Sequence, residues 1–329
     1  MGVAVQVHRI LDRIPRFAHL LRRRPTLPLL LMGARITAVR YGLWRYAATR
    51  APRPKAGPSP LFRDLDVTAA CAVLDAHGFC GGLDLPPALV REIRDFAEQT
   101  PCYGNFDRGL AFLPAAQPDW ERRSGRPIII GHYFEQISRC GAIGALCADP
   151  ALRGLAAAYL HARPRLIRAR LWWSFPSADA HLRLMHLASQ SYFHADIDDW
   201  RSLKFFFYLT DVDGEAGPHR YIRGSHRRKS LAHQLSLTAG KSPQQIARVY
   251  RPDDIITVHG AAGTGFAEDP FVFHTGTRAG SRRRLMLEIH YGISAPVSDH
   301  FFGEPIPRGN ADLAAQIACL DRGVAWQPA

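Results

Sequence analysis

The hydrophobic and polar positions divide the chain into a helical first half and a strand-rich second half. Apolar residues recur at helical spacing from Pro87 to Gln99, and again from Pro150 to Tyr159 behind the capping residue Asp149. Short runs rich in aromatic and apolar residues then favour strands at 166–175, 191–197, 203–210, 219–222, 270–274 and 283–291. This order predicts a mainly β, α+β fold, with flanking helices and a core of two facing antiparallel sheets, a jelly roll whose mouth can hold a metal.

The first sixty residues have a different pattern. Residues 10–21 carry apolar positions at helical spacing (Ile10, Leu11, Ile14, Phe17, Leu20 and Leu21) with arginines between them, which predicts an amphipathic helix despite Pro15. Such a helix would lie on an anionic membrane surface or pack on the following domain, and the pattern does not decide between the two. Arginines then follow every five residues, at Arg35, Arg40, Arg45 and Arg50. They encircle a helix of 3.6 residues per turn, so they form no basic stripe, which weakens the membrane alternative.

A proline-rich stretch at 51–60 reads as an extended linker and sets the expected domain boundary. We therefore expect a basic arm and linker at 1–60 and one domain at 61–329. Within that domain we expect a helical lead-in at about 61–160, the jelly roll at about 165–292 and a C-terminal tail after it.

The formal charge of +13 changes this picture little, because of where the charge lies. Residues 1–60 hold twelve of the 42 basic residues and one of the 29 acidic residues, so the rest of the chain is almost neutral. We accordingly expect no nucleic acid as partner, and contact to an anionic membrane through residues 1–50 is the remaining role for the arm. The charge says little about the substrate.

Composition favours a cytoplasmic protein. The apolar fraction of 47% suffices for a large core, and the six cysteines form no Cys-x-x-Cys pair, which argues against structural zinc and against a disulfide scaffold. The sequence has no run of 18 apolar residues, its start lacks a secretion signal, and Gln6 stands where myristoylation expects Ser or Thr. Any membrane contact is thus expected to be peripheral, at the inner face.

The candidate chemistry lies in His194-Ala195-Asp196 and in His274. Side chains at i and i+2 of a strand share a face, so His194 and Asp196 can reach one metal ion. A histidine from a later strand completes the facial arrangement of two histidines and one carboxylate that leaves positions open on a non-heme Fe(II). This tripeptide is the only His-x-Asp in the chain, and no His-x-Glu occurs. We therefore predict that His194, Asp196 and His274 are catalytic metal ligands.

Several blocks resemble, in order, the phytanoyl-CoA dioxygenase family of Fe(II)/2-oxoglutarate-dependent oxygenases, from Leu65 to about Tyr291. They are DAHGFC at 75–80 with LPPALV at 85–90, HAD at 194–196, GPHRYIRGSH at 217–226, and GTGFAEDP at 263–270 continued by FHTG at 273–276 and RRRLML at 282–287. The third block departs from the family at Arg223, where the family has proline.

The resemblance implies a double-stranded β-helix with a cupin-like core, Fe(II) as metal, and 2-oxoglutarate and O2 as cosubstrates. It further implies hydroxylation of an aliphatic C–H in a small-molecule or carrier-linked substrate, with release of succinate and CO2. Halogenating relatives have a small residue at the carboxylate position, so Asp196 favours hydroxylation. Two alternatives stay open: a cupin-like metal-binding protein without oxygenase activity, and a membrane-recruited protein that acts through its arm.

The family binds the far carboxylate of 2-oxoglutarate with an arginine about ten residues after the second histidine, where Arg282, Arg283 and Arg284 stand. In a strand, Arg283 shares a face with an apolar set, Leu285, Leu287 and Ile289, whereas Arg284 shares a face with Met286, Glu288 and His290. The apolar set is typical of an interior. We therefore predict that Arg283 anchors the cosubstrate and that Arg282 and Arg284 are solvated.

Other polar residues are weaker candidates. Thr277, with Gly276, follows His274 closely, and Gln190 and Tyr192 share the inward face of the His194 strand, so we expect all of them beside the cosubstrate. His226 is a less favoured third ligand, because the family places its Gly-Ser-His turn at the rim. We interpret His226, like His219, His259 and His290, as structural.

Overall fold

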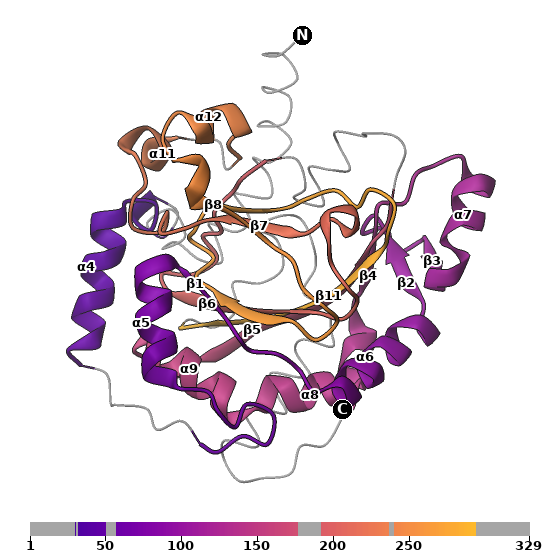
Figure 1. Cartoon of the computed structure of the whole chain (residues 1–329), viewed down its shortest axis with the longest axis horizontal. Helices are drawn as coiled ribbons and strands as arrows, with labels where there is room; N and C mark the ends of the chain where they lie inside the picture. The colour runs from indigo at the N-terminus through magenta and orange to yellow at the C-terminus, as the bar shows by residue number, and fades with distance from the viewer. Residues whose placement is uncertain (1–29, 31, 51–56, 177–191, 237–239, 294–329) are drawn as a thin grey trace, which may run out of the picture.

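Two antiparallel sheets face each other in the computed structural model, which describes residues 30, 32–50, 57–176, 192–236 and 240–293 (Figure 1). Within these residues the larger sheet has the strand order β1-β9-β6-β11-β5-β4-β2-β3, and the smaller has the order β10-β7-β8. The strands are β1 Phe79–Gly81, β2 Cys102–Gly104, β3 Ala111–Phe112, β4 Ile130–Tyr133, β5 Arg165–Ser174, β6 Ser202–Tyr208, β7 His219–Ile222, β8 Ile255–Val258, β9 Gly265–Glu268, β10 His274–Gly276 and β11 Arg284–Gly292. The fold is a jelly roll, as the sequence predicts.

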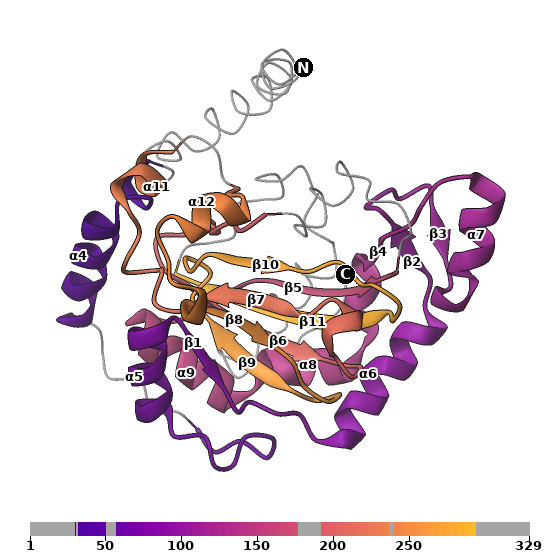
Figure 2. The ribbon, with the colours of Figure 1, turned by 45° about the horizontal axis from the view of Figure 1, so that its top comes forward.

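Helices cover the outer face of the larger sheet, and others lie at the two ends of the molecule, with α4 and α5 at one end and α7 at the other (Figures 1 and 2). They are α4 Thr37–Ala48, α5 Val67–His77, α6 Pro87–Gln99, α7 Gln117–Ser124, α8 Gly141–Ala148, α9 Pro150–Leu160, α11 Leu231–Leu235 and α12 Pro243–Ala247. Short 3-10 turns occur at η1 Pro114–Ala116, η2 Glu135–Arg139, η3 Gly214–Ala216 and η4 Pro252–Asp254. Among the described residues, no helix is long and apolar enough to cross a membrane.

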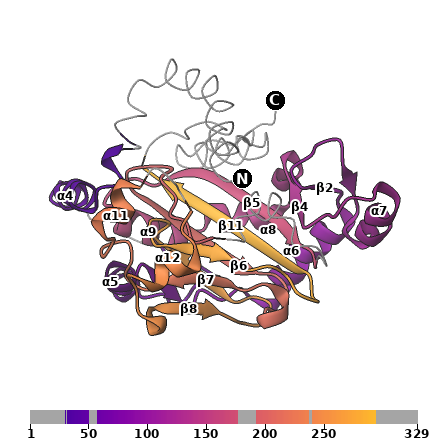
Figure 3. The same cartoon turned by 90° about the horizontal axis from the view of Figure 1, so that it is seen from above.

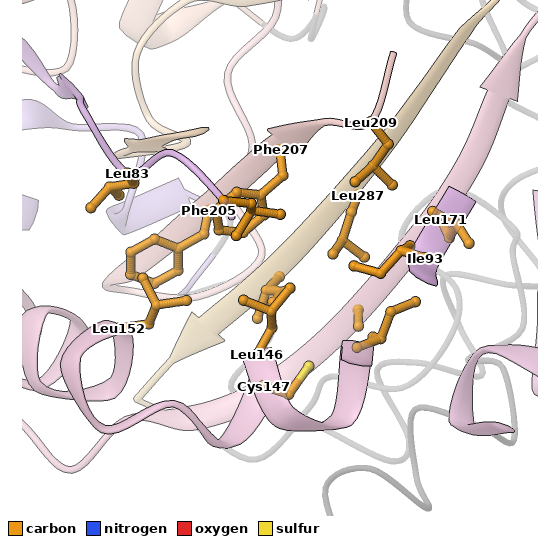
Figure 4. Packing of buried hydrophobic residues seen from close by; sticks show 14 of the residues in the cluster. Leu83, Ile93, Leu146, Cys147, Leu152, Leu171, Phe205, Phe207, Leu209 and Leu287 are labelled. Atoms are coloured by element: carbon orange, nitrogen blue, oxygen red, sulfur yellow. The ribbon is translucent and has the colours of Figure 1, made fainter. Parts of the chain in front are cut away.

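The main hydrophobic core lies between the larger sheet and helices α6, α8 and α9 (Figure 4). Strand residues pointing to the helices are fully buried, among them Leu171, Phe205 and Leu287, and they meet Leu146 of α8 and Leu152 of α9. Each such side chain contributes about 1.5–3 kcal/mol through burial. The apolar side chains at alternate positions of these strands therefore face the helices.

The opposite half of the alternation faces the smaller sheet, which lies across the larger one (Figure 3). In the register, Lys204 of β6 stands opposite His290 of β11 and Glu268 of β9, and residues directly opposite in adjacent strands share a face. All three side chains are nevertheless buried, as are Arg284 and Glu288 farther along β11. The space between the two sheets is thus lined with ionisable groups.

Most predicted elements are present with small shifts. The helix at Pro87–Gln99 has the predicted bounds, and the Asp149 carboxylate caps α9 by accepting from the backbone of Ala151 and Leu152. The expected strand at 191–197 appears only as isolated bridges at Phe193 and His194. The expected strand at 270–274 begins at its last residue, because Asp269 starts a turn in which its Oδ1 accepts from the Phe271 amide. The amphipathic helix predicted at 10–21 lies outside the described residues.

Candidate metal centre

His194 and His274 are neighbours across two strands although they are far apart in the chain. They form an antiparallel bridge in which each backbone N–H donates to the other's carbonyl, at 2.9 Å from His194 and 2.8 Å from His274. Opposite residues of such a bridge point to the same side, and the two imidazole centroids lie 4.4 Å apart. The sheet pairing itself therefore brings the two rings together.

Asp196 joins this pair from two residues after His194. Its backbone N–H donates to the Pro270 carbonyl at 2.8 Å, which fixes the segment against the turn that leads to His274. Nε2 of His194 lies 3.6 Å from Asp196 Oδ1, and Nε2 of His274 lies 3.6 Å from Oδ2. Among the described residues, these three form the one group of His, Cys, Asp or Glu side chains whose donor atoms gather closely enough to hold a metal ion.

The remaining ring nitrogens fit a metal on the Nε2 side. Nδ1 of His274 lies 3.1 Å from the Val272 carbonyl, and Nδ1 of His194 lies 3.5 Å from the Tyr192 carbonyl. A carbonyl can only accept, so the 3.1 Å contact favours the proton on Nδ1 of His274 and leaves its Nε2 to offer a lone pair. The longer contact of His194 is compatible with the same tautomer. The 3.6 Å separations from Asp196 are too long for hydrogen bonds, and an ion bound by all three groups would occupy the space between them.

A buried lysine compensates the carboxylate. Lys204 Nζ contacts Asp196 Oδ2 and lies 3.7 Å from Glu288 Oε2. Burial acts to raise the pKa of the Asp196 carboxyl, but Lys204 and the two imidazoles outweigh burial and hold this pKa well below its usual range. Burial likewise acts to lower the pKa of Lys204, and Asp196 and Glu288 raise it instead. The carboxylate is therefore ionised and ready to bind a cation.

The two histidines have different electrostatic environments. Burial, followed by the influence of His274, lowers the pKa of His194 to about 3, so its imidazole is neutral. Burial also acts to lower the pKa of His274, but Glu268 and Asp196 outweigh it and raise that pKa. Glu268 Oε1 lies 3.4 Å from His274 Nδ1, and its Oε2 lies 2.8 Å from His219 Nε2. Glu268 thus places a buried negative charge beside His274, and its close partner is His219.

The prediction that Arg283 points into the interior is wrong. The alternation along β11 is as expected, but the apolar set that accompanies Arg283 packs against the helices, outside the space between the sheets. The Arg283 side chain is 41% exposed, pairs with Glu98 at 2.8 Å, and lies over the Trp173 ring. It therefore belongs to the outer surface.

Arg284 occupies the interior position instead. Its Nη1 donates to the Gly217 carbonyl, and its Nη2 donates to Ser174 Oγ at 3.2 Å. Nε is buried without a hydrogen-bond partner, and no carboxylate pairs with this guanidinium in the described part of the chain. Burial lowers the pKa of Arg284, although an arginine stays charged. A buried guanidinium with an unused N–H fits the carboxylate of a bound ligand.

The other predicted residues are placed as follows. Tyr192 lies edge-on to the His194 ring at 5.7 Å, and Gln190 lies outside the described residues. Thr277 donates from its N–H and its Oγ1 to the Pro218 carbonyl, at 3.1 and 2.7 Å, next to the glycine that binds Arg284. His226 lies apart from the three ligands, with Nε2 3.1 Å from the Asp75 carbonyl.

The sequence interpretation missed Lys204, Glu268 and Glu288, which surround the ligands. A usable signal exists, because all three are charged residues inside otherwise apolar or aromatic strands. A strand buried on both faces carries such charges only when partners compensate them. His219 of the smaller sheet and His290 of the larger sheet, both interpreted as structural, are buried, and His219 contacts Glu268.

The comparisons with known proteins give matches among solved structures alone. No family model and no curated protein matches the sequence. Among solved structures, the chain is similar to the non-heme α-ketoglutarate-dependent epimerase SnoN from nogalamycin biosynthesis, with 16% identity, 71% of this chain and 87% of that chain covered, and a TM-score of 0.49. It is also similar to apo EctD from S. alaskensis (19% identity, 73% and 83% covered, TM-score 0.49). A third similar structure is HygX from Streptomyces hygroscopicus with nickel and 2-oxoglutarate bound, with 17% identity, 72% of this chain and 88% of that chain covered, and a TM-score of 0.47. At such values, the interpretation of the site rests on the residues of this chain.

Proposed function

We propose that the protein is an Fe(II)- and 2-oxoglutarate-dependent oxygenase that hydroxylates an aliphatic C–H of a small-molecule or carrier-linked substrate. The observation that carries the proposal is the meeting of His194, Asp196 and His274, with both Nε2 atoms and the carboxylate turned to one point. Two histidines and one carboxylate on one side of an ion leave the other positions open. The resemblance of several ordered sequence blocks to the phytanoyl-CoA dioxygenase family supports the same activity.

Iron bound by these three residues would supply the oxidising chemistry, with O2 as oxidant and 2-oxoglutarate leaving as succinate and CO2. The chain's own contribution is positioning. Arg284 is the residue we assign to the far carboxylate of 2-oxoglutarate, because it is the buried cation on β11 that lacks a carboxylate partner in the described part of the chain. Thr277 and Tyr192 remain candidates for the wall of that pocket. Lys204 keeps Asp196 ionised, and the Val272 carbonyl holds Nδ1 of the His274 ring.

A mixed polar and aromatic wall supports a small-molecule substrate. On the inner face of β4 and β5, Arg170 Nη2 lies 3.1 Å from His132 Nε2, and its guanidinium lies 5.2 Å from the centroid of the Trp172 ring. The neighbouring Arg168 pairs with Asp198 at 3.3 Å. Such a surface offers hydrogen-bond donors beside an aromatic plane, which suits a molecule with both polar groups and a hydrocarbon frame.

The test is binding followed by turnover. We expect the wild-type protein to bind Fe(II) without oxygen and to show a visible charge-transfer absorption band when 2-oxoglutarate is added. Admission of oxygen should then release succinate. His194→Ala, Asp196→Ala and His274→Ala should each abolish succinate release while circular dichroism stays unchanged, because each removes one of three ligands.

Two results would contradict the proposal. Full succinate release by His274→Ala would show that another residue is the third ligand. Metal binding without any response to 2-oxoglutarate would favour a cupin-like metal-binding protein. The cytoplasmic location and the contact of residues 1–50 with an anionic membrane remain predictions from the sequence.

A further inference from the structure

Helix α4 belongs to the arm that precedes the predicted catalytic domain, yet one of its faces packs against that domain (Figures 1 and 2). Arg40 on this face is only 4% exposed, whereas Arg45, one and a half turns later, is exposed. Trp44 donates from Nε1 to the Tyr159 carbonyl of α9 at 3.0 Å. Arg40 is the one fully buried residue of α4, and a buried arginine requires a specific partner.

Arg40 connects the two segments that carry the metal ligands. Its Nη2 lies 3.2 Å from Asp269 Oδ1, five residues before His274, and its Nη1 lies 3.4 Å from the carbonyl of Asp199, three residues after Asp196. The guanidinium also lies 4.3 Å from the ring centroid of Phe271. The Arg40 side chain thus contacts both the segment that follows Asp196 and the segment that precedes His274.

The contact with Asp269 leads directly to a ligand backbone. Asp269 Oδ1 also accepts from the Phe271 amide at 2.9 Å, and Oδ2 accepts from the Tyr159 hydroxyl at 3.1 Å, so both carboxylate oxygens are in use. The next residue, Pro270, accepts the hydrogen bond from the Asp196 backbone at 2.8 Å. A shift of the Asp269 turn would therefore move the hydrogen bond that places Asp196.

The residues before α4 add apolar contacts to the same segment. Leu30 and Ala34 are buried and pack against the partly buried Ile197 and Trp200, which lie within four residues after Asp196. Gly33 lies so close that a Cβ at this position would meet the Trp200 ring at 2.7 Å. The arm thus packs on the Asp196 segment and also pairs with the turn before His274.

We propose that α4 is a positioning element of the metal centre and that Arg40 keeps the Asp196 and His274 segments at ligand distance before a metal binds. This inference rests on the metal site of the proposed function. Arg40 touches none of the three ligand side chains, so its role is positioning. A buried Arg–Asp pair is weak evidence for stability as such, and its expected effect is on the geometry of the segments that it joins.

The experiment measures Co(II) binding to the full-length protein by visible absorption, which reports both affinity and ligand geometry without turnover. Arg40→Ala should weaken Co(II) binding at least tenfold and change the Co(II) spectrum. Arg40→Lys should give an intermediate affinity, because an ammonium can pair with Asp269 but cannot also reach the Asp199 carbonyl with a second planar N–H. The matched control is Arg45→Ala on the exposed side of the same helix, which should bind like the wild type.

A second control separates positioning from general destabilisation. Leu146→Ala opens the core between α8 and the sheet, on the face that points away from the ligands, and should lower the melting temperature while leaving Co(II) affinity and spectrum unchanged. If Arg40→Ala does not fold, Arg40→Lys carries the test, with a severalfold loss of affinity as the expected result.

The outcomes are distinguishable. Absence of Co(II) binding by the wild type would overturn the metal site and this inference with it. Wild-type binding together with unchanged affinity and spectrum in the Arg40 variants would overturn this inference alone and leave the proposed function standing. Equal losses in Leu146→Ala and the Arg40 variant would also overturn it, because they would trace the effect to stability.

Discussion

Replacement of Arg284 by alanine should sharply raise the concentration of 2-oxoglutarate that the protein requires. The side chain is 3% exposed, and no carboxylate in the described part of the chain neutralises it, so a ligand carboxylate would be its natural counterion. Truncation of one partner of a buried, hydrogen-bonded charge pair costs about 2–5 kcal/mol. At about 1.4 kcal/mol per tenfold change, the loss in affinity is on the order of thirtyfold to several thousandfold.

The adjacent arginine provides the control. Arg283 is exposed and pairs with Glu98 on the surface, and such pairs contribute about 0–1 kcal/mol, so Arg283→Ala should change the requirement by no more than about fivefold. The 2-oxoglutarate concentration that Arg284→Lys requires should lie between those of the wild type and Arg284→Ala, because an ammonium keeps the charge and loses the planar pairing.

The assay is the dependence of succinate release on the 2-oxoglutarate concentration, together with anaerobic titration of the charge-transfer band. The titration reports binding even where turnover is lost. A change of less than fivefold in Arg284→Ala, or a larger effect in Arg283→Ala, would refute the assignment of the interior face. Equal small effects in both variants would argue that the chain does not use 2-oxoglutarate.

Three further predictions concern stability. Lys204→Met should lower the free energy of unfolding of the metal-free protein by about 3–5 kcal/mol, because it leaves Asp196 without its buried partner. Added Co(II) should raise the stability of this variant more than that of the wild type. Calorimetry would measure both changes. Burial lowers the pKa of His226 to about 4. The neutral form is thus favoured in the fold, and this stability is present above the unfolded pKa of about 6.5 and lost as the pH falls towards 4. Urea unfolding should therefore show that the free energy of unfolding falls between pH 7 and pH 4.5 in the wild type, and that this fall is smaller by on the order of 3 kcal/mol in His226→Gln. Equal falls in the two proteins would contradict the prediction. Asp149→Ala should cost about 0.5–2 kcal/mol through the lost cap of α9, and an unchanged urea midpoint would count against the cap.

The apolar pattern was sufficient to predict individual elements but not which face of a sheet holds the site. Helix α6 and strand β7 have the predicted bounds, and for α6 the proline at its start is a local signal. The alternation along β11 was also right. The face with Arg284 was assigned to solvent because the opposite face is apolar, and the lysine that compensates Glu288 on this polar face comes from another strand. A local pattern carries no information about those partners.

The same reasoning explains why the role of Arg40 was not predicted. Four arginines at five-residue spacing look alike in the sequence, and only Arg40 and Arg45 of the four lie within α4. What distinguishes Arg40 is Asp269, a partner 229 residues later. The three residues that gather at the candidate metal centre could be predicted because two of them lie in one tripeptide and the third in a block that resembles a known family.

The backbone bridge between His194 and His274 also sets the order in which the protein can assemble. These residues enclose a long segment that includes β6 through β9, so their pairing closes a large loop and belongs to the slow, non-local contacts of a β fold. An ion needs both rings at once and would therefore enter a nearly finished jelly roll. It should slow the rate of unfolding and leave the rate of folding almost unchanged, so that iron supply would govern how long the protein persists rather than how fast it forms.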